Sequence, residues 1–547
     1  MMKMFEKKRY KRYIYIIISG ILFSAPFIFP ELNILAFITG IPFYLILFDE
    51  LLNNKNKRYK LTRYAVVFGM SFYLPVYIWF LWMYPMEYTG VTPVQSAFIA
   101  AAAWVGFPVL QTFVLIILPL GLGLFGGICR RNTKDANILF LPVLTACLYV
   151  IAEWVQSWFF SGLTWAKLSV SQYKNLFFIQ SISLFGTYFV SFIIVFINAA
   201  VALYILNRTN KTIPASKNNI LILGVIILYL ANSYFGFFRL MYYDYAKDGK
   251  EKHKITAQVV QGNISSYEKW ESAGIGNSLN KYISLTEKYI GEIGEYTEKI
   301  NISVWPETAI PTNVYQGGNL YEYLRNFSEQ NNITLFTGAF YYLENNVYNA
   351  IVAFAPNHDF IKPYGKRHLV PFGEYLPAEK LVKSVFPFVA NMAMFDSVLT
   401  PGESSGIMEI NGVNYGGLVC FDSIFPELAR QSVKDGADIL IIITNDSWFR
   451  DSPAIYQHNA QAVLRAVENK RYVIRAANTG ISSIISPTGE IIRQSDALVT
   501  DVLIAKAGII KDKTVYTVFG DVILYLSWAY IAFCVGWLVK IRCVPKA

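Results

Sequence analysis

Charged residues are scarce in this chain. They make up 16% of its 547 residues, whereas soluble proteins average about 25% charged residues. Hydrophobic residues make up 54%, and the mean hydropathy is +0.36. These values exclude a wholly soluble protein. Disorder is excluded by 40 Phe, 37 Tyr and 11 Trp, because disordered chains hold few aromatic residues.

Cysteines, histidines and the common cofactor motifs are also sparse. Five cysteines cannot form a disulfide scaffold in a chain of this length. Zinc chemistry is not expected, because the chain has no CxxC or HExxH motif and its four histidines show no metal-ligand spacing. The chain also has no P-loop, which argues against a nucleotide-binding function. We therefore expect neither a metal nor a cofactor.

Positive charge exceeds negative charge. The chain has 48 Lys and Arg against 38 Asp and Glu, a formal charge of +10. The basic residues cluster beside apolar runs, so a membrane explains them better than nucleic acid does. No nucleic-acid partner is expected.

Long apolar runs fill the first 240 or so residues. A run of about 20 apolar residues crosses the hydrocarbon of a bilayer as a helix. Eight spans are predicted, with both ends of the chain on one side of the membrane. They lie near 13–30, 32–49, 64–82, 96–125, 137–158, 178–206, 219–238 and 519–540.

Basic residues in short loops predict the orientation, because Lys and Arg are held back on the cytoplasmic side during insertion. Five segments agree: the amino terminus (Lys3, Lys7, Lys8, Arg9, Lys11, Arg12), the second loop (Lys55, Lys57, Arg58, Lys60, Arg63), the fourth (Arg130, Arg131, Lys134), the sixth (Arg208, Lys211, Lys217) and the tail (Lys540, Arg542, Lys546). A cleaved signal peptide is the alternative for the first span, but Pro26 would obstruct cleavage after Ala25.

Three domains follow from this topology. Residues 1–238 are expected to form a seven-helix transmembrane domain, and 519–547 an eighth helix with a cytoplasmic tail. Residues 239–518 are expected to lie outside the cytoplasm as a catalytic domain.

The expected exported domain alternates short β-branched runs with amphipathic stretches, which predicts an α/β fold with helices covering sheets. Strands are expected at 255–264, 300–305, 333–342, 348–355, 415–420, 439–444 and 472–477, and helices at 279–299, 320–330, 426–433 and 460–469. In open α/β sheets the reactive groups gather at the carboxyl ends of strands.

Cys420 is the only cysteine of the expected exported domain. Its position alone leaves a buried inert thiol and a reactive nucleophile equally open. It closes a predicted strand and precedes Pro426, which fits the first turn of a helix. The positive end of that helix dipole would favour the thiolate. The backbone N–H of Phe421 is then a candidate oxyanion donor.

Two more ionisable residues suit chemistry at a thiol. Glu307 follows a predicted strand beside Trp305, where a partly desolvated carboxylate would be a workable general base; an exposed glutamate would be only a solvated loop residue. Lys366 lies in the loop 364–377, whose glycines, prolines and ionisable groups are typical of site-lining loops. Its ammonium would stabilise a thiolate and an oxyanion, although most lysines are surface residues.

A Cys-His pair is the weaker arrangement. It would use His368 or His458, and no local signature supports either.

At these residues the chain resembles the nitrilase superfamily, whose members use a Glu-Lys-Cys triad on an αββα sandwich. Joined to eight spans, it is similar to the apolipoprotein N-acyltransferase family, over almost the whole chain. The motifs are Val260-Gln261-Gly262-Asn263-Ile264, 305–311, 365–377, Asn445-Asp446-Ser447-Trp448-Phe449, Asn478-Thr479-Gly480, and in the membrane part Glu153-Trp154, Phe160-Ser161-Gly162 and Trp165. Each motif is weak alone, but their order and spacing together are specific.

The resemblance implies a two-stage acyl transfer in a bacterial inner membrane, with the catalytic domain on the periplasmic side. Glu307 matches the family's base, Lys366 its lysine and Cys420 its nucleophile. The thiolate would take an acyl chain from a phospholipid, typically phosphatidylethanolamine, and pass it to the amine of a diacylglyceryl apolipoprotein. Glu374 matches a second, supporting acidic residue. Asp422 stands where the family has a glutamate, which leaves its supporting role open.

Substrate-binding residues are harder to assign. The apolar stretch 385–395, with Phe386, Phe388 and Met392, is either a lipid-facing lid or ordinary core. Trp305 and Trp448 are further candidates from the motifs. Glu153, an ionisable group in a predicted span, is either a functional residue or a structural hydrogen-bonding group.

Two rival functions remain. A membrane-anchored amidase would keep the triad but act on small soluble amides, for which one anchor would suffice. A transporter or receptor would bind ligand without chemistry and would keep its function in Cys420→Ala.

Overall fold

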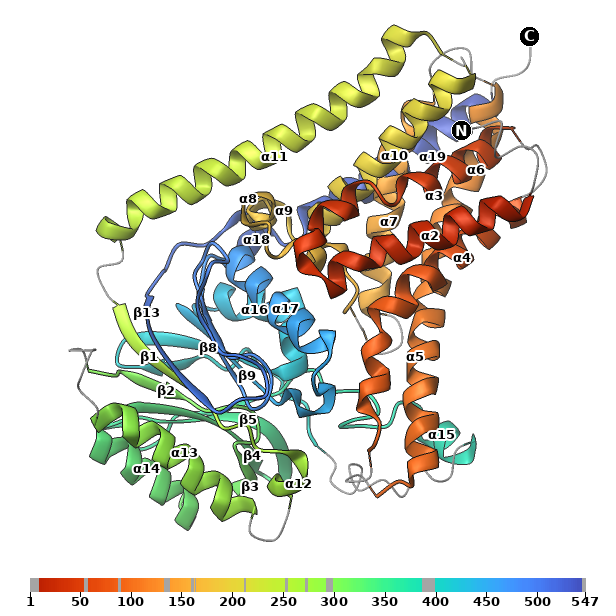
Figure 1. Ribbon diagram of the computed structural model, residues 1–547. Helices are drawn as coiled ribbons and strands as arrows, with labels where there is room; N and C mark the ends of the chain where they lie inside the picture. The colour runs from red at the N-terminus through yellow and green to blue at the C-terminus, as the bar shows by residue number, and fades with distance from the viewer. Residues whose placement is uncertain are drawn as a thin grey trace. The chain divides into compact units, whose positions relative to one another are not determined.

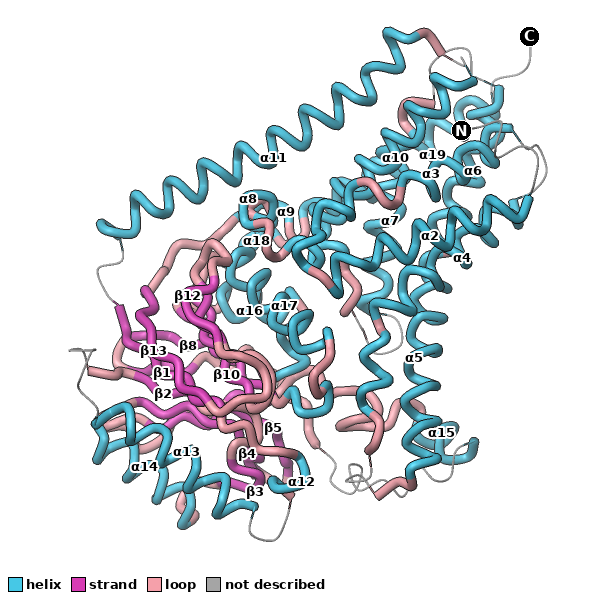
Figure 2. The backbone as a smooth tube through the Cα atoms, viewed as in Figure 1, coloured by secondary structure: helices cyan, strands magenta, loops and turns pink. Residues whose placement is uncertain are grey.

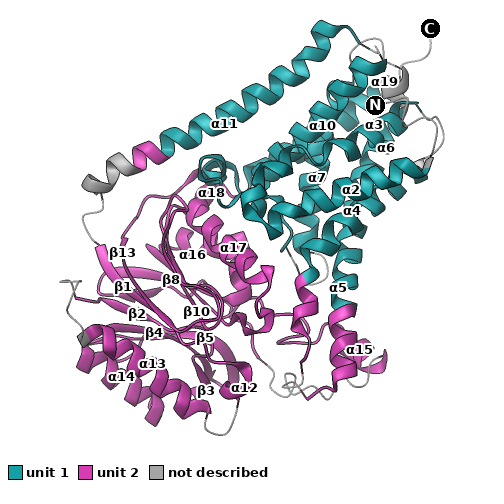
Figure 3. Ribbon diagram, viewed as in Figure 1, with its two compact units in different colours: residues 1–78, 102–239, 521–547 teal, residues 79–101, 240–520 magenta. Residues whose placement is uncertain are grey.

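The computed structural model describes residues 9–53, 58–86, 90–131, 138–158, 162, 164–210, 213–250, 254–270, 274–291, 299–385 and 399–543. The chain forms two compact units (Figure 3). Unit 1 holds residues 1–78, 102–239 and 521–547, and unit 2 holds 79–101 and 240–520. Unit 2 thus takes in the segment 79–101, which the sequence analysis assigns to the transmembrane domain. The membrane sides of the three expected domains remain a prediction.

Unit 1 is helical (Figure 2). Its helices are α2 Arg9–Ile28, η1 Pro30–Phe37, α3 Ile41–Asn53, α4 Arg58–Val76, α6 Ile117–Arg131, α7 Leu141–Trp158, η5 Leu168–Gln172, α8 Leu176–Ile179, α9 Ile182–Phe185, α10 Tyr188–Asn210 and α19 Val522–Cys543. Three more, η2 Ile78–Met83, α5 Pro93–Leu115 and α11 Ala215–Lys250, have residues in both units.

Six helices in the described part of the chain are long and apolar enough to cross a membrane. They are Tyr10–Ile28, Pro30–Asn53, Pro93–Gly126, Tyr188–Asn210, Ala215–Tyr243 and Val522–Lys540. They match six of the eight predicted spans. The other two predicted spans are also helical, but α4 begins with three cations and α7 carries Glu153 and Gln156. Eight spans therefore remain a prediction, while a polytopic helical membrane protein with an inserted α/β domain is what the chain forms.

Close packing in unit 1 depends on a small residue. Helices α2 and α4 meet at Gly20, where an added Cβ would lie 2.7 Å from the Cβ of Ser71. Helices in lipid gain little from burying apolar surface against each other, so such close approach is a main source of their association. The ring of Phe43 on α3 stacks on the ring of Phe68 on α4, and their centroids are 4.1 Å apart.

Unit 2 contains two sheets among its described residues. The seven-stranded sheet has the order β13-β1-β2-β4-β5-β6, with β3 paired to β4, and the six-stranded sheet has the order β12-β11-β10-β9-β8-β7. Their strands are β1 Lys254–Gln261, β2 Ile302–Val304, β3 Ile310–Val314, β4 Thr334–Leu343, β5 Asn346–Phe354, β6 Tyr364–Gly365, β7 Met408–Ile410, β8 Val413–Val419, β9 Ile439–Thr444, β10 Tyr472–Ala477, β11 Ser483–Ile485, β12 Ile491–Gln494 and β13 Asp501–Gly508.

Helices cover the outer faces of the two sheets (Figure 1). Helices α13 Gly274–Gly291 and α14 Asn319–Asn331 lie on the seven-stranded sheet, and α16 Pro426–Lys434 and α17 Pro453–Asn469 on the six-stranded one. The shorter helices are α12 Ser266–Lys269, α15 Glu379–Val385, η8 Cys420–Ile424, η9 Asp446–Phe449 and α18 Val515–Phe519.

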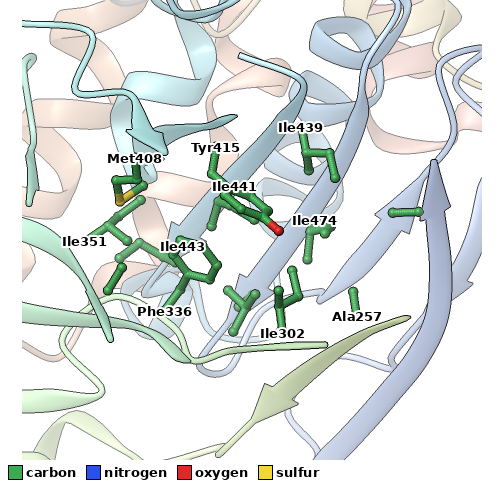
Figure 4. Packing of buried hydrophobic residues seen from close by; sticks show 14 of the residues in the cluster. Ala257, Ile302, Phe336, Ile351, Met408, Tyr415, Ile439, Ile441, Ile443 and Ile474 are labelled. Atoms are coloured by element: carbon green, nitrogen blue, oxygen red, sulfur yellow. The ribbon is translucent and has the colours of Figure 1, made fainter. Parts of the chain in front are cut away.

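A continuous apolar core lies between the sheets (Figure 4). Phe336 on β4 faces Tyr415 on β8, with ring centroids 4.9 Å apart, and Ile441 on β9 is fully buried between them and their neighbours. Burying this apolar surface is the main driving force for stacking two sheets. The order of layers is therefore helix, sheet, sheet, helix, the αββα sandwich that the resemblance implies.

Parallel strands bring the reactive residues to common sheet edges. Strands β8, β9 and β10 run parallel, as do β1, β2 and β4. Cys420 directly follows β8, and Asn445 directly follows β9. Glu307 comes three residues after the end of β2. The carboxyl ends of the strands thus carry the polar residues, as the sequence predicts.

Candidate active site

Cys420 lies in a strained turn. Its φ of 49° places it in the left-handed region, which costs a non-glycine residue about 1–3 kcal/mol. Its carbonyl oxygen accepts a hydrogen bond from Ser423 Oγ (2.7 Å), and His458 Nε2 lies 3.2 Å from the same oxygen. These contacts hold the turn, and the turn holds the thiol at the end of β8.

Glu307 is a buried carboxylate with fixed partners. It is 5% exposed, and its Oε1 accepts from Asn349 Nδ2 at 2.8 Å, while its Oε2 accepts from the backbone N–H of Asn445 at 2.7 Å. Asn445 belongs to the strand end beside that of Cys420, so this bond ties the base to the same sheet edge. The sequence alternative of a solvated loop residue is therefore wrong for Glu307.

Lys366 is 1% exposed and is enclosed by carboxylates. Its Nζ lies 2.8 Å from Glu374 Oε2 and 3.4 Å from Glu307 Oε1. Burial alone would lower the pKa of Lys366, but the charges of Glu374 and Glu307 outweigh it and raise the pKa above its usual value. The ammonium therefore stays charged at neutral pH, and the alternative of a surface lysine is wrong.

The sheet fixes where Lys366 lies. Strand β6 pairs with β5, opposing Gly365 to Ala350, and the backbone N–H of Lys366 then donates to the carbonyl of Asn349 at 2.8 Å. Asn349 in turn donates its Nδ2 to Glu374 Oε1 at 2.9 Å. One asparagine thus positions the lysine through its backbone and both carboxylates through its side chain.

The thiol of Cys420 is not ionised at rest. Burial and then the negative charge of Glu307 raise its pKa well above the usual value, although Lys366 opposes them. The expectation that a helix start favours the thiolate is wrong, because the 3₁₀ turn Cys420–Ile424 separates Cys420 from α16. Pro426 does begin that helix, as predicted.

Asp422 links the lysine loop to the cysteine turn. It is fully buried, and it accepts hydrogen bonds from His368 N (2.8 Å), Tyr364 Oη (2.8 Å) and Val419 N (3.2 Å). A longer contact comes from Arg367 N at 3.4 Å. Its shorter side chain is therefore compatible with a supporting role.

Several predicted binding residues have other surroundings. Trp305 is fully buried, donates its Nε1 to Thr286 Oγ1 at 2.9 Å and stacks on Tyr282, which favours a role in the core. Trp448 is partly buried in η9 and stays a candidate. Phe421 is 7% exposed, and its N–H stays a candidate oxyanion donor. Phe386, Phe388 and Met392 lie outside the described residues.

Glu153 belongs to unit 1. It is 4% exposed, and its Oε1 accepts from the backbone N–H of Leu168 at 2.8 Å. This contact favours the structural alternative for Glu153.

Sequence reasoning missed a buried lysine near the base. Lys269 on α12 is 1% exposed and donates its Nζ to Thr308 Oγ1 at 3.1 Å. Burial lowers its pKa to about 8, although the charge of Glu307 opposes this. Thr308 itself has a φ of 47° directly after Glu307. No sequence signal distinguishes Lys269 from a surface lysine.

A second group lies behind the cysteine. Atoms of Cys420, Asp446 and His458 that could bind a metal lie within 4.8 Å of one another. Both oxygens of Asp446 already accept hydrogen bonds, from Arg475 at one and from Thr444 and His458 at the other. The group is therefore a hydrogen-bonded array. In the sequence, His458 is a candidate only for the weaker Cys-His arrangement. Asp446 is indicated only by the motif in which it lies.

Together the three candidate catalytic residues have the parts needed for nucleophilic attack on a carbonyl carbon. A thiol on a strained turn supplies the nucleophile. A buried carboxylate is available to accept its proton, and a permanent cation is available for the oxyanion. The arrangement suits acyl transfer through a covalent intermediate.

Comparison with known proteins gives matches over most of the chain. The model of the carbon-nitrogen hydrolase family matches residues 256–507, and that of the apolipoprotein N-acyltransferase N-terminal domain matches residues 19–200. The chain is 28% identical over 527 residues to a Geobacter metallireducens protein named apolipoprotein N-acyltransferase, which covers 95% of this chain and 93% of that one. A Rickettsia prowazekii protein with the same name is 26% identical over 534 residues, or 94% of this chain and 95% of that one. Among solved structures, Saccharomyces cerevisiae Nit3, of the nitrilase superfamily, covers 50% of this chain and 94% of its own, at 20% identity and a TM-score of 0.37.

Proposed function

The chain belongs to the apolipoprotein N-acyltransferase family, and on that premise we propose how it performs N-acyl transfer. A fatty acyl chain passes from a membrane lipid to Cys420 as a thioester, and then to the α-amino group of the diacylglyceryl-cysteine of an apolipoprotein. The convergence of Cys420, Glu307 and Lys366 is the observation that carries this proposal.

The first half-reaction forms the thioester. Glu307 accepts the proton of the Cys420 thiol as the sulfur attacks the ester carbonyl of the lipid. Lys366 Nζ and the backbone N–H of Phe421 stabilise the oxyanion of the tetrahedral intermediate. The carbon–oxygen bond then breaks, Glu307 returns the proton to the leaving alkoxide, and a lysophospholipid departs. The raised pKa of the thiol supports this order, in which deprotonation accompanies attack.

The second half-reaction forms the amide. The α-amine of the lipoprotein attacks the thioester carbonyl, and the same donors stabilise the oxyanion. As the carbon–sulfur bond breaks, the amine loses a proton through Glu307, and the sulfur leaves as a thiolate and takes that proton. Atoms and charges balance over the cycle, so Cys420 returns to the thiol and Glu307 to the carboxylate.

The donor is phosphatidylethanolamine, and the protein lies in the bacterial inner membrane with its catalytic domain on the periplasmic side. The basic residues of the loops predicted to be cytoplasmic support this orientation. Membership of the family supports lipid and lipoprotein substrates in general. The phosphatidylethanolamine headgroup of the donor is proposed in addition.

The test uses the purified full chain in detergent with two substrates, phosphatidylethanolamine and a diacylglyceryl-cysteine peptide. The expected products are one lysophospholipid and one N-acylated peptide per turnover. Cys420→Ala should release neither product while keeping the unfolding temperature. N-acylation by Cys420→Ala would refute the proposal. Hydrolysis of soluble amides without lipid would favour the amidase instead.

A further inference from the structure

Lys269 is a buried ammonium group that the proposed mechanism does not use. It is the last residue of α12 and is 1% exposed, and its Nζ donates to Thr308 Oγ1 at 3.1 Å. Thr308 directly follows Glu307 and is 7% exposed. Lysines are almost never this deeply buried unless they are paired. The partner of this ammonium therefore indicates what it does.

The short helix α12 is fastened to the sheet edge that carries the reactive residues. Asn478, which directly follows β10, donates its Nδ2 to the carbonyl of Ile264 at 2.7 Å and accepts from the N–H of Ile264 at 3.0 Å. The same Nδ2 donates to Asn445 Oδ1 at 3.0 Å, at the end of β9. Ser266 Oγ of α12 lies 2.9 Å from Ser447 Oγ of η9. These contacts fix α12 beside the ends of β9 and β10.

The turn that carries Glu307 is held by two elements. Thr308 has a φ of 47°, a conformation that persists in a non-glycine residue only when its surroundings fix it. Strand β4 packs on the backbone of the turn, because a Cβ at Gly338 would lie 2.5 Å from the carbonyl oxygen of Pro306 and 2.6 Å from the Cα of Glu307. Helix α12 provides the second hold, through the bond from Lys269 to the Thr308 hydroxyl.

The charges divide into two pairs. Lys366 Nζ lies nearer to Glu374, at 2.8 Å, than to Glu307, at 3.4 Å. Within the described part of the chain, Glu307 is the only charged group that acts on Lys269. Burial lowers the pKa of Lys269 to about 8, although the charge of Glu307 opposes this, so most of the ammonium keeps its proton at pH 7. Two buried carboxylates thus have two buried ammonium groups, which offsets the cost of burying them.

We propose that Lys269 is a positioning residue for the general base, because its ammonium fixes the strained turn through Thr308 and favours the ionised form of Glu307. It acts on the base and not on the substrate. The inference rests on the proposed role of Glu307, but one of its two tests reads the pair without any catalysis.

The first test follows single-turnover thioester formation with phosphatidylethanolamine against pH, in the purified full chain. The acid limb of this profile reports protonation of the base, since only the carboxylate accepts the thiol proton. Lys269→Met keeps an apolar stem and removes the ammonium. Its acid limb should move to higher pH by about 1 unit, because a nearby positive charge favours an ionised carboxylate by about 1–3 units. Lys269→Gln should do the same, whereas Lys269→Arg keeps the charge and should keep the wild-type limb.

The other groups around Glu307 are unchanged in these variants. Strands β4 and β5 and the end of β9 contribute the uncharged Gly338, Asn349 and Asn445. The titratable and charged groups from the lysine loop, from η8 and from the elements packed on η8 are Lys366, Glu374, Cys420, Asp422, Asp446, His458 and Arg475. A shift of the acid limb therefore belongs to position 269.

The second test is a double-variant cycle in the free energy of unfolding at pH 7, with Lys269→Met, Glu307→Gln and both together. Each single variant leaves one buried charge without its partner, and the double variant leaves neither. The loss in the double variant should therefore be clearly smaller than the sum of the two single losses. This measurement needs no substrate.

Two control variants separate the turn from the charge. Ser266→Ala removes the contact of α12 with Ser447 and keeps the ammonium, so it should lower the unfolding temperature and leave the acid limb in place. Thr308→Val removes the hydroxyl that Lys269 binds, so it should slow thioester formation at every pH without moving the limb.

An unchanged acid limb in folded Lys269→Met and Lys269→Gln, or an additive cycle, would overturn the inference. A wild-type rate in folded Thr308→Val would contradict the hold on the turn. Absence of a thioester in the wild type together with a coupled cycle would instead refute only the proposed function.

Discussion

Asp422→Asn tests how the lysine loop is joined to the cysteine turn. The substitution keeps the size of the side chain but removes its charge and turns one acceptor oxygen into a donor NH₂ group. In the native chain Oδ1 accepts from His368 N at 2.8 Å, and Oδ2 accepts from Tyr364 Oη at 2.8 Å and Val419 N at 3.2 Å. In either orientation the new NH₂ group faces a backbone N–H.

The cost follows from the contacts. A hydrogen bond to a charged group contributes about 1.5–3 kcal/mol, and a buried donor left unsatisfied costs about 1–3 kcal/mol. Asp422 is fully buried, so solvent does not screen this loss. About 3 kcal/mol or more is therefore lost from the junction that fixes Lys366 beside Cys420. That energy corresponds to a factor of about 100 in rate.

The assay is single-turnover formation of the Cys420 thioester with phosphatidylethanolamine, alongside thermal unfolding. Asp422→Asn should form the thioester about 100-fold more slowly and unfold at a lower temperature. Asp438→Asn is the matched control, because Asp438 is also buried, at 3% exposure, and accepts from Asn414 N at 3.0 Å away from the site. It should lose stability and keep its rate. A wild-type rate in folded Asp422→Asn would refute the linking role of Asp422.

Three further predictions follow from single contacts. Asn349→Leu removes the amide that donates to Glu307, and thioester formation should slow about 10–100-fold; an unaltered single-turnover rate would contradict this. Lys269 has its pKa lowered from 10.5 to about 8, so between those pH values the unfolded chain binds a proton that the folded chain lacks, and stability should rise with pH by on the order of 3 kcal/mol. Lys269→Met should lack that rise when its free energy of unfolding is measured with denaturant at pH 7 and pH 10.5. An equal rise in the native chain and in the variant would contradict the assignment of the rise to Lys269. Gly480→Ala should displace Asp446 and lower stability by about 1–3 kcal/mol in thermal unfolding, whereas an unchanged melting temperature would show that the site can relax.

The buried strands are predictable because burial on both faces requires a continuous apolar run. Strand β9 matches its predicted range 439–444, and all six of its residues are buried. Strand β13 was missed, since its partly exposed residues and the exposed Lys506 break the apolar pattern. Strand β6 has two residues, too few for any periodic signal.

The candidate site divides in the same way. Strand ends and punctuated loops, which are local features, make Glu307, Lys366 and Cys420 candidates, and the family resemblance assigns their roles. Asn349 is a single polar residue inside a strand pattern, and its side-chain bond to Glu307 spans 42 positions. Such contacts arise only once the sheets are assembled.

The resting state of the thiol also needs the folded chain. The start of a helix suggests a thiolate, but the raised pKa of Cys420 results from burial and from Glu307, which is distant in sequence. His458 is another case, because one histidine on an amphipathic helix gives no hint of the carbonyl that it faces.

The most direct measurement is the intact mass of the purified chain after incubation with phosphatidylethanolamine alone. The account predicts an added fatty acyl group, located on Cys420 by peptide mapping and released by hydroxylamine, with one lysophospholipid formed per chain. Addition of a diacylglyceryl-cysteine peptide should then remove that mass and yield the N-acylated peptide. No acyl mass on an active protein, or an acyl group on any other residue, would contradict the account.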